Sequence, residues 1–227
     1  MLTHRKTFAA PTLALAALLL AACSPGTDSR GTGGTGEQTA SPGTALAAVD
    51  TLTVRGRAPK TGYERDEFGS PWADVDGNGC STREDVLKRD LAGVRFTDGH
   101  CKVASGTLTD DPYTGTTVTY VRGRSKVDID HVVALSDAWQ KGAQKWDAET
   151  RRRFANDPLN LLAVDSATNR RKSDGDAASW LPPNQAYRCT YVARQVAVKK
   201  KYGVWVTAAE RDAMKRVLAD CPQQKLP

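Results

Sequence analysis

The spacing of apolar residues changes several times between residues 81 and 164, and these changes predict an α+β fold. Ser81 or Thr82 can cap a helix that runs to Leu91. Apolar and β-branched runs then predict short strands around Val103 and at 106–109, 116–121 and 127–133. Residues 136–156 are expected to form one helix that ends before Pro158, and a further short strand is expected at 160–164.

Two amphipathic helices are predicted at the C-terminal end of the chain. In each, four residues follow the spacing of one helix face: first Cys189, Val192, Ala193 and Val196, then Met214, Val217, Leu218 and Cys221. The first helix is expected to end near Gly203, and Thr207 with Glu210 predicts a capping box for the second. Cys189 and Cys221 then both lie roughly 20 Å from the turn, so antiparallel packing brings them together.

Four cysteines follow residue 23, and an even number in an exported chain predicts two disulfides. The number alone allows three pairings. The predicted helical hairpin selects Cys189–Cys221, which leaves Cys80–Cys101. No two of these cysteines have CxxC spacing, so a structural zinc site is not expected.

Residues 1–22 have the pattern of a signal peptide. A basic patch at 4–6 precedes an apolar run at 8–20, which is too short to span a bilayer because spanning takes about 20 apolar residues. The letters LAAC match the lipobox of bacterial lipoproteins. They predict lipidation of Cys23 and a place on the extracellular face of the cell membrane, or release as a secreted form. The alternative is an ordinary signal peptide followed by a chance cysteine.

Residues 23–50 are expected to be a flexible linker, because 24–44 is nearly all Gly, Ser, Thr and Pro. About 20 such residues span roughly 25 Å, which is enough to hold a domain away from a membrane. The folded domain is assigned to 51–227, with its first ordered residue expected between Ala45 and Val54.

The 227 residues suit one globular domain with appendages. The net charge is +6, and removal of residues 1–22, which contain Arg5 and Lys6, lowers it to +4. A basic exported domain suits a polyanionic partner. A solvated basic surface explains the charge equally well.

The segment WADVDGNGC resembles the first half of a calcium-binding loop, with Asp74, Asp76 and Asn78 as candidate ligands. An EF-hand needs Glu at its twelfth position, where this chain has the shorter Asp85, and no entering helix is evident. The favoured interpretation is a tight turn that leads into Cys80, with calcium binding as the alternative.

Polar residues gather in three segments, DIDHVVAL (128–135), DPLNLLAV (157–164) and SATNRRKSD (166–174). They predict a strand ending in Asp130 and His131, a strand opening with Asn160, and a helix carrying Asn169. The His131 imidazole can accept a proton from water near neutral pH. Asp130 and Asn169 offer one carboxylate and one amide oxygen to a hard cation, which leaves positions for water and phosphate oxygens. This set of groups suits phosphodiester hydrolysis.

These three segments resemble the HNH nuclease motif, a ββα-metal arrangement. The D-x-D-H-V-V opening and the N-R-x-K-S-D close are similar to the HNH domain of RNA-guided CRISPR effectors. The exported context and WADVDGNGC resemble small secreted HNH endonucleases of actinobacteria, which are related to the C-terminal domain of GmrSD-type restriction enzymes. The resemblance implies an α+β protein with an HNH ββα-metal core, added helices and a disulfide-linked C-terminal helical hairpin.

The resemblance also implies roles for single residues. It makes His131 the general base, makes Asp130 and Asn169 the metal ligands, and gives Asn160 a structural task in fixing the loop that carries His131. Three basic residues would hold phosphate oxygens, unless they are only a solvated face: Arg170, Arg171 and Lys172. Many HNH enzymes have His where this chain has Asn169, which favours Mg²⁺ or Mn²⁺ over Zn²⁺. Asp128 is left without a role.

The predicted function is therefore metal-dependent endonuclease cleavage of DNA, with RNA not excluded as a substrate. Little sequence specificity is expected, because the chain has no recognisable helix-turn-helix or zinc-finger reader. No protein partner is implied. Two alternatives remain open: a calcium-stabilised envelope lipoprotein that binds a ligand, and a nuclease fold that binds nucleic acid without cutting it.

Overall fold

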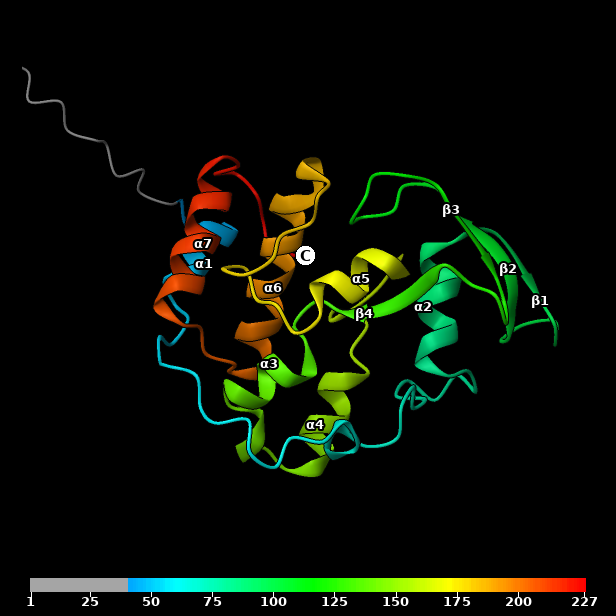
Figure 1. Ribbon diagram of the computed structural model, residues 1–227, viewed down its shortest axis with the longest axis horizontal. Helices are drawn as coiled ribbons and strands as arrows, with labels where there is room; N and C mark the ends of the chain where they lie inside the picture. Colours follow the sequence, from blue (N-terminus) through cyan, green and yellow to red (C-terminus); the bar gives the residue numbers. More distant parts are fainter. Residues whose placement is uncertain (1–40) are drawn as a thin grey trace, which may run out of the picture. The chain divides into compact units, whose positions relative to one another are not determined.

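The computed structural model describes residues 41–227, so the expected signal peptide, Cys23 and most of the expected linker lie outside the described residues. Figure 1 traces the elements along the chain. The α-helices are α1 (Ala45–Val49), α2 (Thr82–Asp90), α3 (Leu135–Gln140), α4 (Ala148–Ala155), α5 (Ser166–Lys172), α6 (Arg188–Tyr202) and α7 (Ala208–Ala219). The strands are β1 (Ala92–Phe96), β2 (Val103–Leu108), β3 (Val118–Val121), β4 (Val127–His131) and β5 (Leu161–Asp165). Short 3-10 helices are η1 (Arg65–Phe68), η2 (Ala143–Lys145) and η3 (Gln185–Tyr187).

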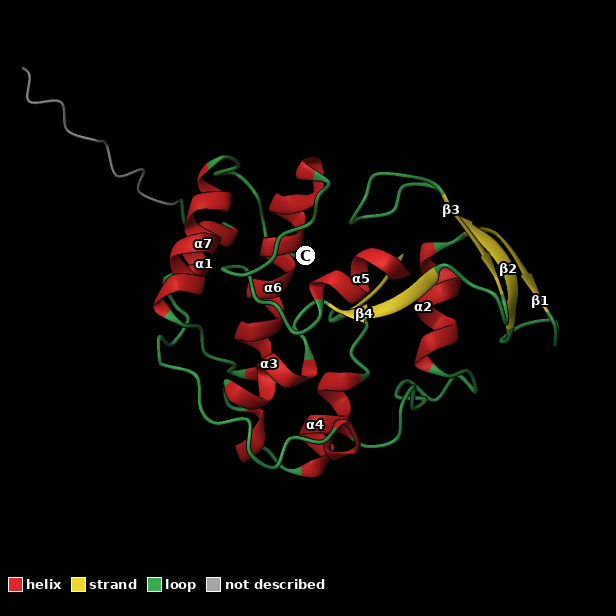
Figure 2. Ribbon diagram, viewed as in Figure 1, coloured by secondary structure: helices red, strands yellow, loops and turns green. Residues whose placement is uncertain are grey.

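The strands form two antiparallel sheets, as Figure 2 shows. One contains β1, β2 and β3 in chain order, and the other pairs β4 with β5. The sequence analysis did not predict β1. The register of the second sheet places Asp130 opposite Leu162 and His131 opposite Leu161. Within the described range, every helix is too short or too polar to span a lipid bilayer.

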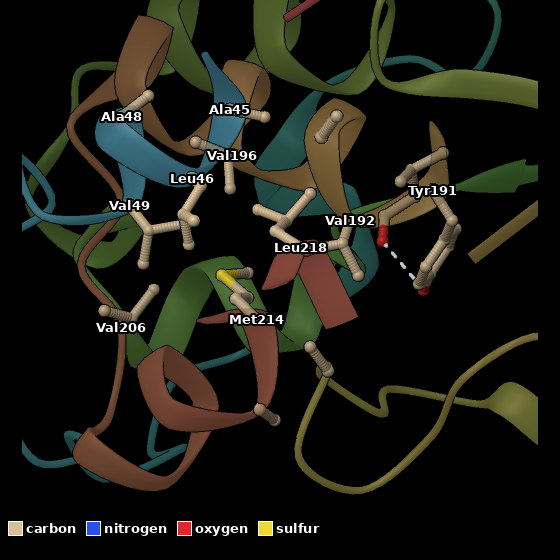
Figure 3. Close-up of a cluster of buried hydrophobic side chains, with 14 of the residues drawn as sticks. Ala45, Leu46, Ala48, Val49, Tyr191, Val192, Val196, Val206, Met214 and Leu218 are labelled. Carbon is tan, nitrogen blue, oxygen red and sulfur yellow. Dashed lines mark hydrogen bonds between the residues drawn. The ribbon is translucent and has the colours of Figure 1, made fainter. Parts of the chain in front are cut away.

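Most residues of the β4–β5 ribbon are buried; β5 is a nearly continuous apolar run, whereas β4 alternates apolar residues with Asp128 and Asp130. Alternation along the strands sends Ile129 and Leu161 toward a cluster with α2 and the three-stranded sheet. Leu162 and Val164 belong to a second cluster with α1, α6 and α7. Figure 3 shows the helical part of that cluster, with Ala45, Leu46, Val49, Tyr191, Val192, Val196, Met214 and Leu218 among the labelled side chains.

The folded part begins earlier than residue 51, the boundary assigned from sequence. Thr44 caps α1 by accepting a hydrogen bond from the backbone N–H of Ala47, and Ala45 and Val49 are fully buried. The helix packs against α6 and α7. Residues 45–49 are therefore part of the domain and not of the linker.

The single helix expected at 136–156 is instead three short helices, α3, η2 and α4. Gly142 interrupts the first with φ of 129°, a conformation that only glycine adopts readily. The Asp147 carboxylate then starts α4 by accepting a hydrogen bond from the N–H of Thr150 at 2.6 Å. The chain turns at both places, and α4 ends at Ala155, before Pro158.

Both expected disulfides are present, Cys80–Cys101 and Cys189–Cys221. The first ties the start of α2 to β2, and the second joins α6 to the end of α7. Thr207 caps α7 through the N–H of Glu210 at 3.1 Å, as expected. The Glu210 side chain does not complete a capping box, because it is fully buried between Lys141 and Lys199.

Candidate active site

The β4 and β5 strands and the helix α5 form a strand–strand–helix unit that gathers the expected site residues. Helix α5 starts directly after β5, because the Asp165 carboxylate caps it through the N–H of Thr168 at 2.7 Å. Asp130, His131 and Asn169 line one open pocket of about 340 Å³. Its other polar lining residues are Lys60, Tyr63, Arg65, Ser136, Ser173 and Asp174.

The His131 ring is held in one tautomer. Its Nε2 atom lies 2.8 Å from the carbonyl oxygen of Ala155, and a carbonyl can only accept, so Nε2 carries the proton. Nδ1 is then the atom with the free lone pair. The Trp72 ring stacks on the imidazole, with 6.2 Å between centroids and 15° between planes. Burial opposes the charged ring and lowers the pKa of His131 to about 3, so the ring is neutral near pH 7 and Nδ1 carries no proton.

Asn160 fixes the chain on the C-terminal side of His131. The Asn160 side chain is fully buried, and its Oδ1 atom accepts a hydrogen bond from the N–H of Val133 at 2.8 Å. Its Nδ2 atom donates to the carbonyl oxygen of Val133 at 3.3 Å. The Asn160 carbonyl also accepts from the N–H of Val132 at 2.8 Å. The side chain touches the loop after His131 and does not line the pocket.

The buried Asp130 carboxylate has two side-chain partners, Lys172 and Tyr113, and the sequence did not indicate either contact. Its Oδ1 atom accepts from the Lys172 ammonium at 3.0 Å, and its Oδ2 atom accepts from the Tyr113 hydroxyl at 2.5 Å. Lys172 also donates to the carbonyl of His131 at 2.9 Å. Burial raises the pKa of Asp130, and the positive charge of Lys172 opposes that rise. Burial also raises the pKa of the Tyr113 hydroxyl, and the nearby Asp130 carboxylate adds to this effect, so the hydroxyl keeps its proton.

The position of Lys172 corrects the expectation that it holds phosphate from solvent together with Arg170 and Arg171. Lys172 is only 2% exposed and faces β4, whereas the two arginines are exposed on the other side of α5. Arg171 donates to the Thr168 hydroxyl at 2.7 Å. The tract of three basic residues therefore divides into two surface cations and one buried counter-ion.

Asp128, which had no expected role, orients Asn169. The amide Nδ2 of Asn169 donates to Asp128 Oδ2 at 3.2 Å. This bond fixes which end of the amide is the donor, and it leaves the amide oxygen of Asn169 without a hydrogen-bond donor within residues 41–227.

Residues 81–217 match the family described as GmrSD restriction endonucleases, C-terminal domain. This match spans more than half of the chain. The protein belongs to this family. All of the strand–strand–helix unit lies inside the matched range, as the resemblance to GmrSD-type enzymes led us to expect. Lys60, Arg65 and Trp72 precede it.

A relative from Arthroderma benhamiae (strain ATCC MYA-4681 / CBS 112371) bears the name "Uncharacterized secreted protein". It is 44% identical over 180 residues, which cover 78% of this chain and 85% of the relative. No solved structure matches the chain.

The donor atoms of this GmrSD C-terminal domain fit a hard divalent cation. Among residues 41–227, no three His, Cys, Asp or Glu side chains gather as metal ligands, so a zinc-type site is not formed there. The Asp130 carboxylate and the Asn169 amide face the same pocket, and each carboxylate oxygen keeps a second lone pair beside its hydrogen bond. One carboxylate, one amide and water suit Mg²⁺ or Mn²⁺.

The Asp74–Cys80 segment forms a hydrogen-bonded turn. The Asp74 carboxylate accepts from the N–H groups of Gly77 and Gly79 at 2.7 and 2.9 Å. Asn78 Oδ1 accepts from the N–H of Cys80 at 2.7 Å, which completes a tight turn into the first disulfide. These bonds form the tight turn that the sequence favours, and they leave each Asp74 carboxylate oxygen a second lone pair.

Three residues of the candidate site lie far from the motif in sequence: Arg65, Trp72 and Tyr113. Tyr113 is separated from Asp130 by 17 residues, and no local pattern links the two. Asp174 belongs to the motif segment 166–174. Its Oδ2 atom accepts a hydrogen bond from the Ser136 hydroxyl at 3.1 Å.

Proposed function

We propose that the protein is an exported, metal-dependent endonuclease of the HNH type that hydrolyses DNA phosphodiester bonds with little sequence specificity. Membership in the GmrSD restriction endonuclease C-terminal domain family supports a nuclease-related function. The observation that carries the proposal is the His131 ring. Its Nε2 proton is held by a backbone carbonyl, which leaves Nδ1 free, and His131 lines a pocket together with Asp130 and Asn169.

In this proposal His131 removes a proton from water at Nδ1 while the Ala155 carbonyl stabilises the ring that becomes charged. Asn160 keeps the His131 loop in place. Lys172 and Tyr113 keep the Asp130 carboxylate oriented toward the pocket. Asp130 and Asn169 would hold Mg²⁺ or Mn²⁺, which when bound neutralises charge on the phosphate.

Arg170 and Arg171 are exposed beside Asn169 and are assigned to phosphates that flank the cleaved bond. Contacts of this kind position the nucleic acid without selecting its sequence, which agrees with a low specificity. The same contacts are available to RNA.

Three observations support a location outside the cytoplasm. The N-terminal sequence has the pattern of a lipoprotein signal peptide, the structure holds two disulfides, and the relative from Arthroderma benhamiae is named a secreted protein. We assign the protein to the extracellular face of the membrane, anchored through a lipid on Cys23.

A nicking assay on supercoiled plasmid tests the function. The wild-type protein is expected to cut with Mg²⁺ or Mn²⁺ and to stop when a chelator is added. His131→Ala should lose about 10²- to 10⁴-fold in rate, because it removes the proton acceptor, while DNA affinity stays close to wild type. A labelled RNA of the same sequence, run in parallel, decides the substrate. Wild-type protein that binds plasmid but never cuts it with any divalent cation would leave only the non-cleaving alternative.

A further inference from the structure

A segment before the family-matched range forms one wall of the candidate site. Residues 60–72 supply Lys60, Tyr63 and Arg65 to the pocket with Asp130, and Arg65, Phe68 and Trp72 help to line a smaller, more apolar pocket that His131 also lines. Arg65 lines both pockets. It therefore lies next to His131, although 66 positions separate the two residues in the chain.

The segment that carries Arg65 is anchored to α4. Phe68, in the same 3-10 turn as Arg65, is 1% exposed, and its ring centroid lies 6.0 Å from that of Phe154. The Arg151 guanidinium donates to the carbonyl of Glu67 at 2.7 Å. Gly69 ends the turn with φ of 79°, and a Cβ there would lie 3.3 Å from the Arg152 side chain. These contacts fix the backbone from which Arg65 extends.

The two cations of this wall differ in their partners. Lys60 forms an ion pair with Asp174 at 3.5 Å. Arg65 is exposed and forms no ion pair or hydrogen bond through its side chain within residues 41–227. Arg65 and His131 line the same two pockets. A guanidinium without a partner among the described residues therefore belongs to the wall of the place where the proposed reaction occurs.

We propose that Arg65 binds the scissile phosphate and stabilises the negative charge that develops on it during hydrolysis. A guanidinium suits this task because its planar set of N–H donors matches two phosphate oxygens at once and never loses its charge. Lys172 is not available for this task, because its ammonium is already bound to Asp130. This inference rests on the proposed nuclease function and adds a catalytic residue from outside the matched family domain.

Single-turnover cleavage of a fluorescein-labelled DNA duplex at saturating protein tests the effect on the chemical step. Arg65→Gln is expected to be about 100-fold slower than wild type, because one preorganised charge on the phosphate is lost. Arg65→Lys should lose less, since it keeps the charge but not the paired donors. Arg216→Gln is the matched control: it removes the same charge from an exposed position on α7, which lines neither pocket, and should cut at the wild-type rate.

A binding measurement separates this inference from the proposed function. In the His131→Ala background, the affinity for the same duplex is measured by anisotropy over a range of salt concentrations. Arg65→Gln should reduce the slope of log affinity against log salt by about 1, as expected for one lost phosphate contact, and Arg216→Gln should not. If wild type never cleaves but the slope falls with Arg65→Gln, the phosphate contact stands and the nuclease proposal fails. If wild type cleaves and Arg65→Gln changes neither rate nor slope, the inference about Arg65 is wrong and the nuclease proposal stands.

Discussion

The helical part of the molecule and the strand–strand–helix site each bury lysines against carboxylates, but the two groups differ in what surrounds them. In the helical part, the Lys141 ammonium contacts Asp137, Asp176 and Glu210 at 2.6, 2.8 and 2.6 Å. Three acids are matched there by three cations, since Lys199 and Arg57 bind the same carboxylates. None of these groups lines either pocket beside His131. We call this set the helical charge network.

At the site, one lysine meets one carboxylate. Lys172 binds Asp130, and Asp130 also faces the open pocket. The helical charge network has all its partners inside the protein, so it can only hold the helices together. At the site, Asp130 can exchange Lys172 for a cation or another ligand that enters the pocket. Buried charges of the same residue types therefore serve the fold in one region and remain available for chemistry in the other.

The largest expected effect is the loss of one acid from the helical charge network. Glu210→Gln leaves two fully buried lysines, Lys141 and Lys199, without one of their carboxylates. The free energy of unfolding should fall by about 3–5 kcal/mol, because an uncompensated buried charge remains. Urea unfolding measures the change.

The exposed pair Lys215–Asp50 is the control for Glu210→Gln. Its side chains are 40% and 55% exposed, so Lys215→Met should change stability by about 0–1 kcal/mol. A loss of the same size in both variants would mean that the helical charge network contributes no more than a surface ion pair.

The second effect is the acid sensitivity of the helical charge network. Burial raises the pKa of Asp176, but the positive charges of Lys141, Arg57 and Lys199 and the hydrogen bond from Lys141 together outweigh burial and bring the pKa to about 2, below the unfolded value of 3.8. A carboxyl with a lowered folded pKa stabilises the protein above the unfolded pKa and loses that contribution as pH falls toward the folded pKa. The contribution is about 2 kcal/mol, present at pH 5 and mostly lost by pH 2.

Urea unfolding of wild type and Asp176→Asn over this range measures the contribution of Asp176. The difference in stability between the two proteins should narrow by about 2 kcal/mol from pH 5 to pH 2. The exposed Asp212 is the matched position, and the difference between wild type and Asp212→Asn should stay constant. A constant difference for Asp176→Asn as well would show that the network does not depend on this carboxylate.

Local sequence patterns predicted the elements that are determined by residues close together in the chain. The β4 strand through His131, the β5 strand and the C-terminal hairpin with its disulfide all follow from spacing and capping. Gly142 and Asp147 were visible in the sequence as a helix breaker and a new helix cap. The apolar residues on both sides nevertheless led to the prediction of one continuous helix.

The partners of the site residues could not be predicted, because they come from distant segments. Tyr113 lies in the connection between β2 and β3 and reaches Asp130 only when that connection packs near β4, and the Arg65 segment reaches His131 by packing on α4. Lys172 is an intermediate case. It stands three residues after Asn169 and so shares its helix face, yet the run of three basic residues indicated a solvated surface. Only the packing of α5 on β4 shows which of the three is buried.

The smallest expected effect tests whether the Asp130–Lys172 pair can exchange its partner. Lys172→Met removes the ammonium from Asp130 and from the carbonyl of His131. The cost should be about 1–2 kcal/mol in the presence of a chelator, because water in the pocket can reach the carboxylate. Added Mg²⁺ should raise the melting temperature of this variant more than that of wild type, since the cation no longer competes with the ammonium for Asp130.

Lys199→Met supplies the matched comparison for Lys172→Met. It removes an equally buried lysine from Asp137 and Glu210, in the helical charge network, which lines neither pocket beside His131. Its stability loss should be larger and should not respond to Mg²⁺ beyond the wild-type response. Thermal melts of the three proteins with chelator and with Mg²⁺ give the result without any measurement of activity. Equal responses to Mg²⁺ in both variants would show that the buried lysine at the site is as inaccessible as those between the helices, and that Asp130 does not exchange Lys172 for a cation.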